Sequence, residues 1–273
     1  MSIMFIYPDI PPAIAISIGP LDIRWYGLMY LIGLLIAWWG IKNSFKKNAH
    51  FNLDPKDAED LIFYTAFGLI LGGRIGYMLF YGWQNLINDP LSLVRVWEGG
   101  MSFHGGLLGG FFGIYYFAKA HKIDLGNLLD VIVPWVPPGL FFGRVGNFLN
   151  GELWGSVASP DIWWAFIVRG VPRHPSQLYE ALFEGLLLFI LLQYLSLKPK
   201  PKFFLSGVFL LSYGVVRFAI EFVRLPDLHM NPDAGGYIAF NWLTMGQILT
   251  APLILIGIIM ISFSLKKRYE TVS

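Results

Sequence analysis

Ionisable side chains recur at helical spacing inside an apolar stretch of the sequence around residue 220. Tyr213, Arg217, Glu221 and Arg224 are separated by four, four and three residues among Val, Phe and Ile, so a helix would carry them on one face. A charge inside hydrocarbon costs at least ~2.5–3.5 kcal/mol, which makes such residues functional candidates. The simpler interpretation is an Arg217–Glu221 ion pair that only holds helices together. The stripe is basic overall, however, which a purely structural pair does not require.

A second set of polar residues lies at the end of the apolar run 128–149, in the segment GRVGNFLNGELWG. Arg144 and Asn147 share a helical face there. Arginine and amide groups suit an anionic oxygen, and the glycines permit close approach of the backbone to a ligand. The alternative is an arginine that reaches the membrane interface beside a helix end. The other polar residues of this segment are Asn150 and Glu152.

Three more candidates stand at or near the ends of apolar runs. His104 opens the run 104–118, Arg74 lies among glycines, and Tyr26 follows Arg24 and Trp25. Close helix packing is the expected role of the glycines that recur every four residues around Arg74 and after His104. A structural arginine, an interfacial or core histidine and an aromatic belt are the competing interpretations. Candidate partners for the arginines share one face of a later run and are Gln177, Glu180 and Glu184.

The composition places these side chains in a membrane protein. Of the 273 residues, 55% are hydrophobic and only 14% are charged, against roughly 25% charged in soluble proteins. A net charge of +2 is too small to indicate nucleic-acid binding, and without cysteine the chain has no disulfide, thiolate metal site or cysteine nucleophile. Since a membrane helix needs about 20 apolar residues, we predict an all-α integral membrane protein with about seven transmembrane helices. The predicted spans are 24–41, 61–81, 104–118, 128–149, 178–196, 204–224 and 245–265.

Lysine and arginine in the connecting loops predict the orientation. Twelve lie in loops or the tail on one side of the spans and three on the other, which predicts a cytoplasmic C-terminus and an outside N-terminus. This orientation gathers a set of polar residues at the outer end of one polytopic domain, residues 1–273, with a small extracytoplasmic element around 150–177. The set is Tyr26, His104, Arg144 to Glu152, His174 to Glu180 and Arg217 to Arg224. Several arginines with few paired carboxylates predict an anionic ligand at the outer leaflet, above all a lipid phosphate.

At these motifs the sequence resembles the prolipoprotein diacylglyceryl transferases of the bacterial inner membrane. The likeness covers nearly the whole chain. The segments that carry it are Ile18-Gly19-Pro20, Arg24 to Leu28, Gly72 to Tyr77, Gly100 to Gly106, Gly143 to Gly155, Arg173 to Glu180, Arg217 to Arg224 and Met245-Gly246-Gln247.

The resemblance implies transfer of the diacylglyceryl group from phosphatidylglycerol to the lipobox cysteine thiol of a preprolipoprotein. A thioether forms and glycerol phosphate is released, in the first step of lipoprotein maturation. The implied enzyme is a multi-pass inner-membrane protein with its site on the periplasmic or outer side, without a metal or organic cofactor. The expected partners are phosphatidylglycerol, lipobox signal peptides and membrane lipids, and not nucleic acid. The candidate catalytic residues are His104, Arg144 and Arg217, and the candidate substrate-binding residues are Tyr26, Arg74, Asn147, Asn150, Glu152, Glu221 and Arg224.

The expected chemistry assigns a role to the basic residues. Arg144 and Arg217 would hold the phosphate and stabilise charge on the departing group. The substrate thiol must lose its proton, and His104 is the first choice as general base, with Glu152 second. His104 could instead bind the headgroup. A transporter or flipping protein for anionic lipids would use the same residues without chemistry, but it would favour midplane charges and paired repeats. This sequence has neither an internal repeat nor a cytoplasmic-side polar cluster.

Overall fold

The computed structural model describes residues 5–8, 14–18, 21–47, 53–226, 235–240 and 242–270. The chain divides into two compact units. The first unit comprises residues 1–37 and 129–273, and the second unit comprises residues 38–128. Each unit is described by itself below.

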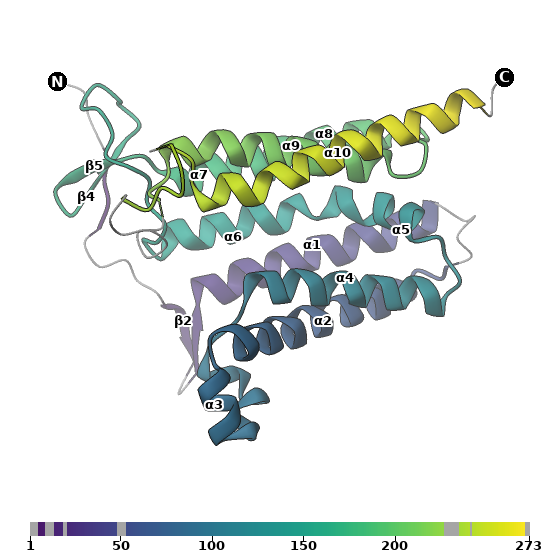
Figure 1. Cartoon of the computed structure of the whole chain (residues 1–273), viewed down its shortest axis with the longest axis horizontal. Helices are drawn as coiled ribbons and strands as arrows, with labels where there is room; N and C mark the ends of the chain where they lie inside the picture. The colour runs from purple at the N-terminus through teal and green to yellow at the C-terminus, as the bar shows by residue number, and fades with distance from the viewer. Residues whose placement is uncertain are drawn as a thin grey trace. The chain divides into compact units, whose positions relative to one another are not determined.

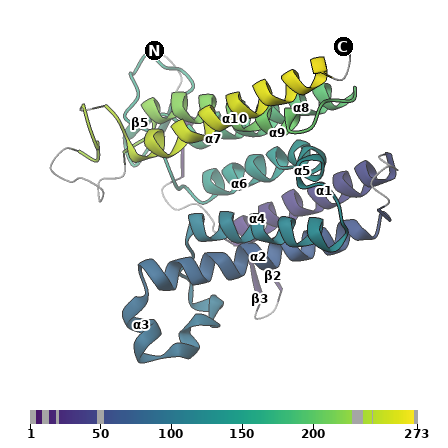
Figure 2. The ribbon, with the colours of Figure 1, turned by 45° about the vertical axis from the view of Figure 1, so that its right-hand side comes forward.

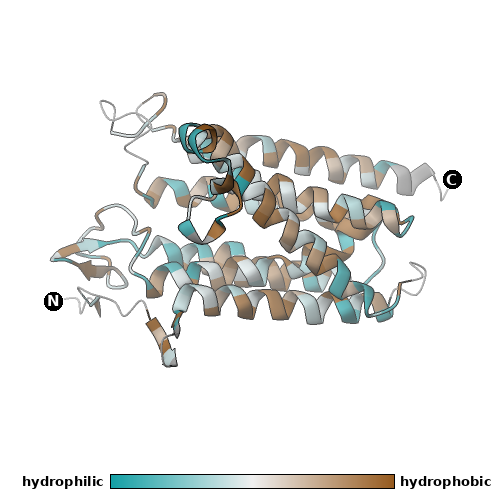
Figure 3. Cartoon of the chain, turned by 90° about the horizontal axis from the view of Figure 1, so that it is seen from below, coloured by the Kyte–Doolittle hydropathy of each residue, from teal (hydrophilic) through white to brown (hydrophobic). Residues whose placement is uncertain are grey.

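Within the described ranges, five helices are long and apolar enough to cross a membrane, and a bent helix pair is a sixth candidate span. Figure 3 shows hydrophobic residues along the length of these helices. The bend of 40° separates Leu125–Trp135 from Pro137–Leu149, where Pro137 and Pro138 start the second helix because proline suits a first turn. The five straight candidates are α1 (Trp25–Lys47), α2 (Asp57–Phe80), Ser176–Ser196, Phe204–Val223 and Met245–Lys266.

These six candidates coincide with six of the seven predicted spans, so the prediction of a helical membrane protein is confirmed. The remaining range, 104–118, is helical as α4 (Phe103–Ala120). It is not among the candidate spans of the described residues. Its 18 residues include His104 and Lys119, and these polar side chains lower its mean hydropathy. The count of seven and the side on which each terminus lies stay predictions.

The first unit is built from two sets of packed helices. α9 (Phe204–Ile220) runs beside α10 (Met245–Glu270), and α6 (Pro137–Leu149) packs against the helical segment 176–196 (Figure 1). That segment consists of α7 (Ser176–Glu180), the π-helical η5 (Ala181–Leu187) and α8 (Leu188–Ser196). A Cβ on Gly185 of η5 would lie 2.7 Å from the Cα of Phe141. Glycine at this position therefore allows η5 to approach α6 closely.

A side chain from another helix caps α9. Asp130, on α5 (Leu125–Ile132), accepts hydrogen bonds from the backbone N–H of Ser206 at 2.8 Å and from the Ser206 hydroxyl at 2.5 Å. The first backbone N–H groups of a helix have no partner within the helix. Asp130 thus satisfies one of these groups from outside α9.

Short strands of the first unit form two small sheets. β2 (Ile14–Ile18) and β3 (Leu21–Arg24) form an antiparallel hairpin. β4 (Phe166–Val168) pairs in parallel with β1 (Phe5–Ile6) and antiparallel with β5 (Val171–Arg173). This second sheet adjoins a cluster of packed aromatic rings, which are Tyr7, Phe148, Trp154 and Phe166.

The second unit is dominated by the pair α2 and α4, which lie side by side (Figure 2). The stretch of chain that connects α2 to α4 forms α3 (Trp83–Asn88) and two 3-10 turns, η2 (Pro90–Leu93) and η3 (Val96–Glu98). We call this segment, residues 83–100, the arm. Ser102 then starts α4, because its hydroxyl accepts a hydrogen bond from the backbone N–H of Gly105 at 3.2 Å.

Candidate active site

Three segments of the first unit bring six ionisable side chains together. α6 contributes one arginine, and the α7–η5 segment contributes two glutamates. The third segment runs from α9 through the 3-10 turn η6 (Glu221–Val223) to Arg224, and it contributes two arginines and one glutamate. Each segment ends or changes its helical form near these side chains. The six residues, which we call the charge cluster, are Arg144, Glu180, Glu184, Arg217, Glu221 and Arg224.

Glu180 is the centre of the charge cluster. Its side chain is 1% exposed, and its Oε1 accepts hydrogen bonds from Arg217 Nη1 at 2.7 Å and Arg224 Nη1 at 2.6 Å. Its other oxygen, Oε2, lies 2.6 Å from Arg144 Nε. One buried carboxylate therefore fixes three guanidinium groups, and the prediction of Glu180 as a partner of the arginines is confirmed.

The other two glutamates are held less tightly. Glu221 Oε2 lies 3.3 Å from both Arg217 Nη2 and Arg224 Nε, so the Arg217–Glu221 pair exists but is one part of a larger network. Glu184 is fully buried, and its oxygens lie 3.9 Å from Arg144 Nη2 and Arg217 Nη1. With three arginines and three glutamates, the charge cluster as a whole is balanced when all six side chains are ionised, unlike the α9 stripe taken alone.

The π-helical segment η5 coincides with the two buried glutamates of the charge cluster. Glu180 is the last residue of α7 and Glu184 lies within η5. A π-helical turn contains more residues than an α-helical turn, and such turns often occur at functional sites. The π-helical segment thus begins directly after Glu180, the first of the two buried carboxylates, and contains Glu184, the second.

The turn after α6 positions two amides around one carboxylate. Gly151 has a φ of 69°, which suits glycine, and Glu152 N–H donates to the Asn147 carbonyl at 2.9 Å. The side-chain amides of Asn147 and Asn150 then donate to the two oxygens of Glu152, each at 3.4 Å. The structure therefore joins these three predicted residues in one small network beside Arg144 in sequence.

Main-chain contacts tie this turn to the other two segments. Gly155 N–H donates to the His174 carbonyl, and Ser156 N–H donates to the Val223 carbonyl, both at 2.9 Å. Gln177 Nε2 also donates to the Glu152 carbonyl at 2.6 Å. The three motifs that surround Arg144, Glu180 and Arg224 therefore meet at the backbone of Gly155.

We expect Gly155→Ala to reduce activity at least tenfold, because the added methyl group has no space. A Cβ at this position would lie 2.5 Å from the Val223 carbonyl oxygen and 2.9 Å from the His174 carbonyl oxygen. Such overpacking costs roughly 1–3 kcal/mol and shifts backbone, which would move Arg224 away from Glu180. Turnover of purified variants checks this expectation. Gly139→Ala is the control, because a Cβ there meets no atom within 4 Å; equal turnover of the two variants would contradict the prediction.

Tyr26 also belongs to the first unit. It is the second residue of α1, and its hydroxyl is hydrogen-bonded to the Tyr30 hydroxyl at 2.9 Å. A Cβ on Gly146 would lie 3.1 Å from the Tyr26 ring. The ring therefore covers the same end of α6 that carries Arg144 and Asn147.

His174 lies at the start of α7 in a chain of polar contacts. Its Nδ1 is 3.1 Å from the Tyr179 hydroxyl, which accepts a hydrogen bond from Trp164 Nε1 at 2.8 Å. Burial lowers the pKa of the His174 imidazole below its ordinary value, so this histidine is neutral at pH 7.

Two predicted residues belong to the second unit. Arg74 is 3% exposed and donates to the backbone carbonyls of Ser92, Leu93, Gly99 and Gly100. These contacts give Arg74 a structural role in holding the arm, while its role in substrate binding stays a prediction. His104 is an exposed residue in the first turn of α4, and its role as a base also stays a prediction.

Sequence reasoning missed some residues that support the charge cluster. Thr244 Oγ1 donates to Glu221 Oε1 at 3.0 Å, and Gln247 Nε2 donates to the Phe218 carbonyl at 3.5 Å. A Cβ on Gly246 would lie 2.6 Å from Glu221 Cδ. These contacts account for the Met245-Gly246-Gln247 motif, whereas a lone threonine before a helix gave no signal.

One group in the described residues has the composition of a metal site. The ligand atoms of Asp57, Asp60 and His121, in the second unit, lie within 4.8 Å of one another. Its carboxylates are partly exposed, and His121 Nε2 lies 3.9 Å from Asp57 Oδ1. This arrangement suits an ion pair between α2 and the end of α4 as well as it suits a metal ion.

Comparison with known proteins identifies the family. A family model described as prolipoprotein diacylglyceryl transferase matches residues 13–263. The chain belongs to this family. The transferase family match includes every residue of the charge cluster and all other predicted site residues.

Bacterial relatives of the transferase family are similar over nearly their full lengths. A phosphatidylglycerol–prolipoprotein diacylglyceryl transferase of Methylococcus capsulatus is 48% identical over 268 residues, which cover 97% of this chain and 99% of that protein. Proteins of the same name from Oleidesulfovibrio alaskensis and Chromohalobacter salexigens are 48% and 46% identical, and each alignment covers at least 97% of both chains.

Proposed function

We propose that this chain transfers the diacylglyceryl group from phosphatidylglycerol to the lipobox cysteine thiol of preprolipoproteins. The full-length similarity to transferases of that name carries the proposal. The buried arginines of the charge cluster support it, because guanidinium groups bind phosphate oxygens with paired hydrogen bonds. The similarity favours this activity over lipid transport without chemistry.

The proposed reaction forms one bond and breaks one bond. The cysteine sulfur attacks the glyceryl carbon that carries the phosphate, and the carbon–oxygen bond breaks. Glycerol phosphate leaves with the electron pair of that bond, and the thiol proton passes to a base. The product is a thioether, and no oxidation or reduction takes place.

Arg144 and Arg217 would stabilise the negative charge on the departing phosphate. Preorganised donors aimed at developing charge lower a barrier without reorganising during the reaction. Glu180 supports this preorganisation because it touches both guanidinium groups. Arg144 is 21% exposed and is the most accessible of the three arginines, so it would meet the substrate first.

His104 is the first choice for the base and Glu152 the second. A free cysteine thiol has a pKa of ~8.5, so a nearby acceptor would raise its nucleophilicity at neutral pH. The Glu152 carboxylate is exposed and is held by two amides. Tyr26, Asn147, Asn150, Glu221 and Arg224 complete the proposed binding site.

We also propose that the chain lies in the bacterial inner membrane with this site on the outer side. The candidate spans and the bacterial relatives support a multi-pass inner-membrane protein. The excess of lysine and arginine in alternate loops supports an outside N-terminus and a cytoplasmic C-terminus.

The first test is incubation of purified protein with phosphatidylglycerol and a lipobox peptide. We expect the peptide to gain the mass of a diacylglyceryl group, and a Cys→Ser peptide to gain none. Lipid that stays bound while the thiol peptide is unchanged would favour transport instead.

Substitutions then test the roles. We expect Arg144→Ala and Arg217→Ala each to lose at least ~100-fold in turnover, as removal of a stabilising donor typically does. Full activity in either variant would contradict the phosphate clamp. Near-normal turnover in both His104→Gln and His104→Ala would move the role of base to Glu152.

A further inference from the structure

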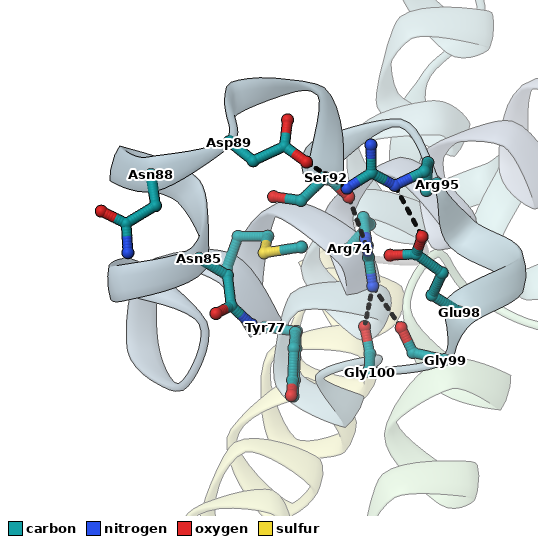
Figure 4. Close-up of a pocket in the computed structure, with 11 residues that line it drawn as sticks. Arg74, Tyr77, Asn85, Asn88, Asp89, Ser92, Arg95, Glu98, Gly99 and Gly100 are labelled. Atoms are coloured by element: carbon teal, nitrogen blue, oxygen red, sulfur yellow. Dashed lines mark hydrogen bonds and ion pairs between the residues drawn. The ribbon is translucent and has the colours of Figure 1, made fainter.

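A polar pocket of about 280 Å³ lies within the second unit, between the C-terminal part of α2 and the arm. Figure 4 shows the α3 side chains on one side of this pocket, with Arg74, Arg95 and Glu98 opposite them. Its volume corresponds to roughly nine water-sized groups at about 30 Å³ each. The polar residues used in the argument below are Asn85, Asn88, Asp89, Ser92, Arg95 and Glu98.

The charges that line the pocket are already paired. Arg95 donates to the carboxylate of Asp89, and its Nε lies 2.6 Å from Glu98 Oε1. The hydrogen bond from Arg95 holds the pKa of Asp89 below its ordinary value, so this carboxyl is ionised at neutral pH. Arg74 donates to four backbone carbonyls. Because Arg74 is committed to backbone carbonyls and Arg95 to two carboxylates, the lining favours a neutral ligand over a phosphate.

A buried hydroxyl on the wall of the pocket has no partner. Ser92 is 5% exposed, and its Oγ forms no hydrogen bond with any described residue. A buried polar group without a partner costs free energy, and native proteins rarely contain one unless a water or a ligand satisfies it. Ser92 therefore points to a hydrogen-bonding ligand in this pocket.

The lining suits a ligand with adjacent hydroxyl groups. The amides of Asn85 and Asn88 each offer a carbonyl acceptor beside an N–H donor. A hydroxyl group both donates and accepts, so two neighbouring hydroxyls match one amide. The Tyr77 ring adds an apolar wall that can cover carbon atoms.

We propose that this pocket binds a neutral vicinal diol. Two sources share this chemistry, which are the glycerol headgroup of a phosphatidylglycerol molecule and a free polyol such as glycerol. The lipid source rests on the proposed function, whereas the diol chemistry does not. A lipid headgroup bound at the arm would make this a second lipid site, which shares no residue with the charge cluster.

Matched lipids test the proposal with the full-length protein in detergent. Phosphatidylglycerol is compared with a phosphatidylpropanol of the same acyl chains, which keeps the phosphate but lacks both headgroup hydroxyls. Native mass spectrometry gives the affinity for each lipid, and saturation-transfer NMR gives binding of free glycerol. We expect the wild type to bind phosphatidylglycerol at least about fivefold more tightly, the effect of one good hydrogen bond.

Substitutions in the pocket test whether a preference for phosphatidylglycerol over phosphatidylpropanol arises there. Ser92→Ala, alone and with Asn85→Leu, should make the two lipids bind equally, whereas Gln84→Leu on the same helix but outside the lining should keep the preference. Saturable glycerol binding that Ser92→Ala abolishes, without a lipid preference, would assign the site to a free polyol. The proposal fails if the wild type discriminates neither lipid nor glycerol, or if the pocket variants discriminate as the wild type does. Transfer to a lipobox peptide, measured on the same samples, tests the proposed function separately.

Discussion

Glu180→Gln is expected to lose at least about 100-fold in diacylglyceryl transfer while Glu184→Gln retains most of it. The Glu180 carboxylate receives three guanidinium groups, with both oxygens occupied. Glutamine has one acceptor oxygen, so its N–H₂ group must face at least one arginine, and the negative charge that compensates them is lost. Removing one partner of a buried ion pair costs roughly 3–5 kcal/mol of stability, so the three guanidinium groups would leave the positions that Glu180 now fixes.

Glu184→Gln is the matched control. The two glutamates are one helical turn apart and both buried, but the Glu184 oxygens lie 3.9 Å from the nearest arginine nitrogens. The measurement is turnover of each purified variant, with thermal unfolding to confirm that each is folded. Turnover of Glu180→Gln within threefold of the wild type, or an equal loss in both variants, would contradict the role given to Glu180.

Gly109→Ala is expected to lower the apparent Tm by about 5–10 °C, since overpacking costs roughly 1–3 kcal/mol or more. α2 and α4 touch through their backbones at this residue. A Cβ on Gly109 would lie 2.8 Å from the Gly68 carbonyl carbon and 2.9 Å from the Gly72 Cα. Because both obstacles are backbone atoms, the helices must move apart and lose contact along their length.

Gly110→Ala provides the comparison for this result. A Cβ there meets its nearest atom, Leu69 Cβ, at an ordinary 3.8 Å. Alanine also forms helix better than glycine by up to ~1 kcal/mol, so the Tm should stay the same or rise slightly. Thermal unfolding in one detergent, followed by light scattering and intrinsic fluorescence, measures both. Equal Tm values for the two variants would show that the glycines do not determine this packing.

The sequence predicted the helices well because hydrocarbon imposes a simple rule. Each predicted span except 104–118 matches a candidate span of the structure, since about 20 apolar residues are needed to cross a bilayer. The exception follows from the same rule, because α4 is short and its 18 residues include His104 and Lys119. Loop charges predict orientation because they act during insertion, whereas their contacts in the folded chain, such as the ion pair of Lys42 with Glu59, do not tell the two sides apart.

The site was predicted in part. Helical spacing alone placed Arg217, Glu221 and Arg224 on one face, and the structure joins them. The sequence also named Glu180 among three candidate partners for the arginines, but spacing could not single it out as the common acceptor of Arg144, Arg217 and Arg224, because long-range pairing depends on packing. The contacts of Arg74 with the arm have the same origin, since backbone carbonyls give no signal in a sequence.

The cap on α9 limits how the site can move. From Ser206 to Arg217 the helix rises about 16 Å, and Asp130 holds the starting point of that rise from a different helix. Sliding of α9 along its own axis would break these two hydrogen bonds, so the cap opposes any change in the distance between Arg217 and α5. Lipid exchange that keeps the cap would therefore involve rotation of side chains or movement at the turn Glu221–Val223.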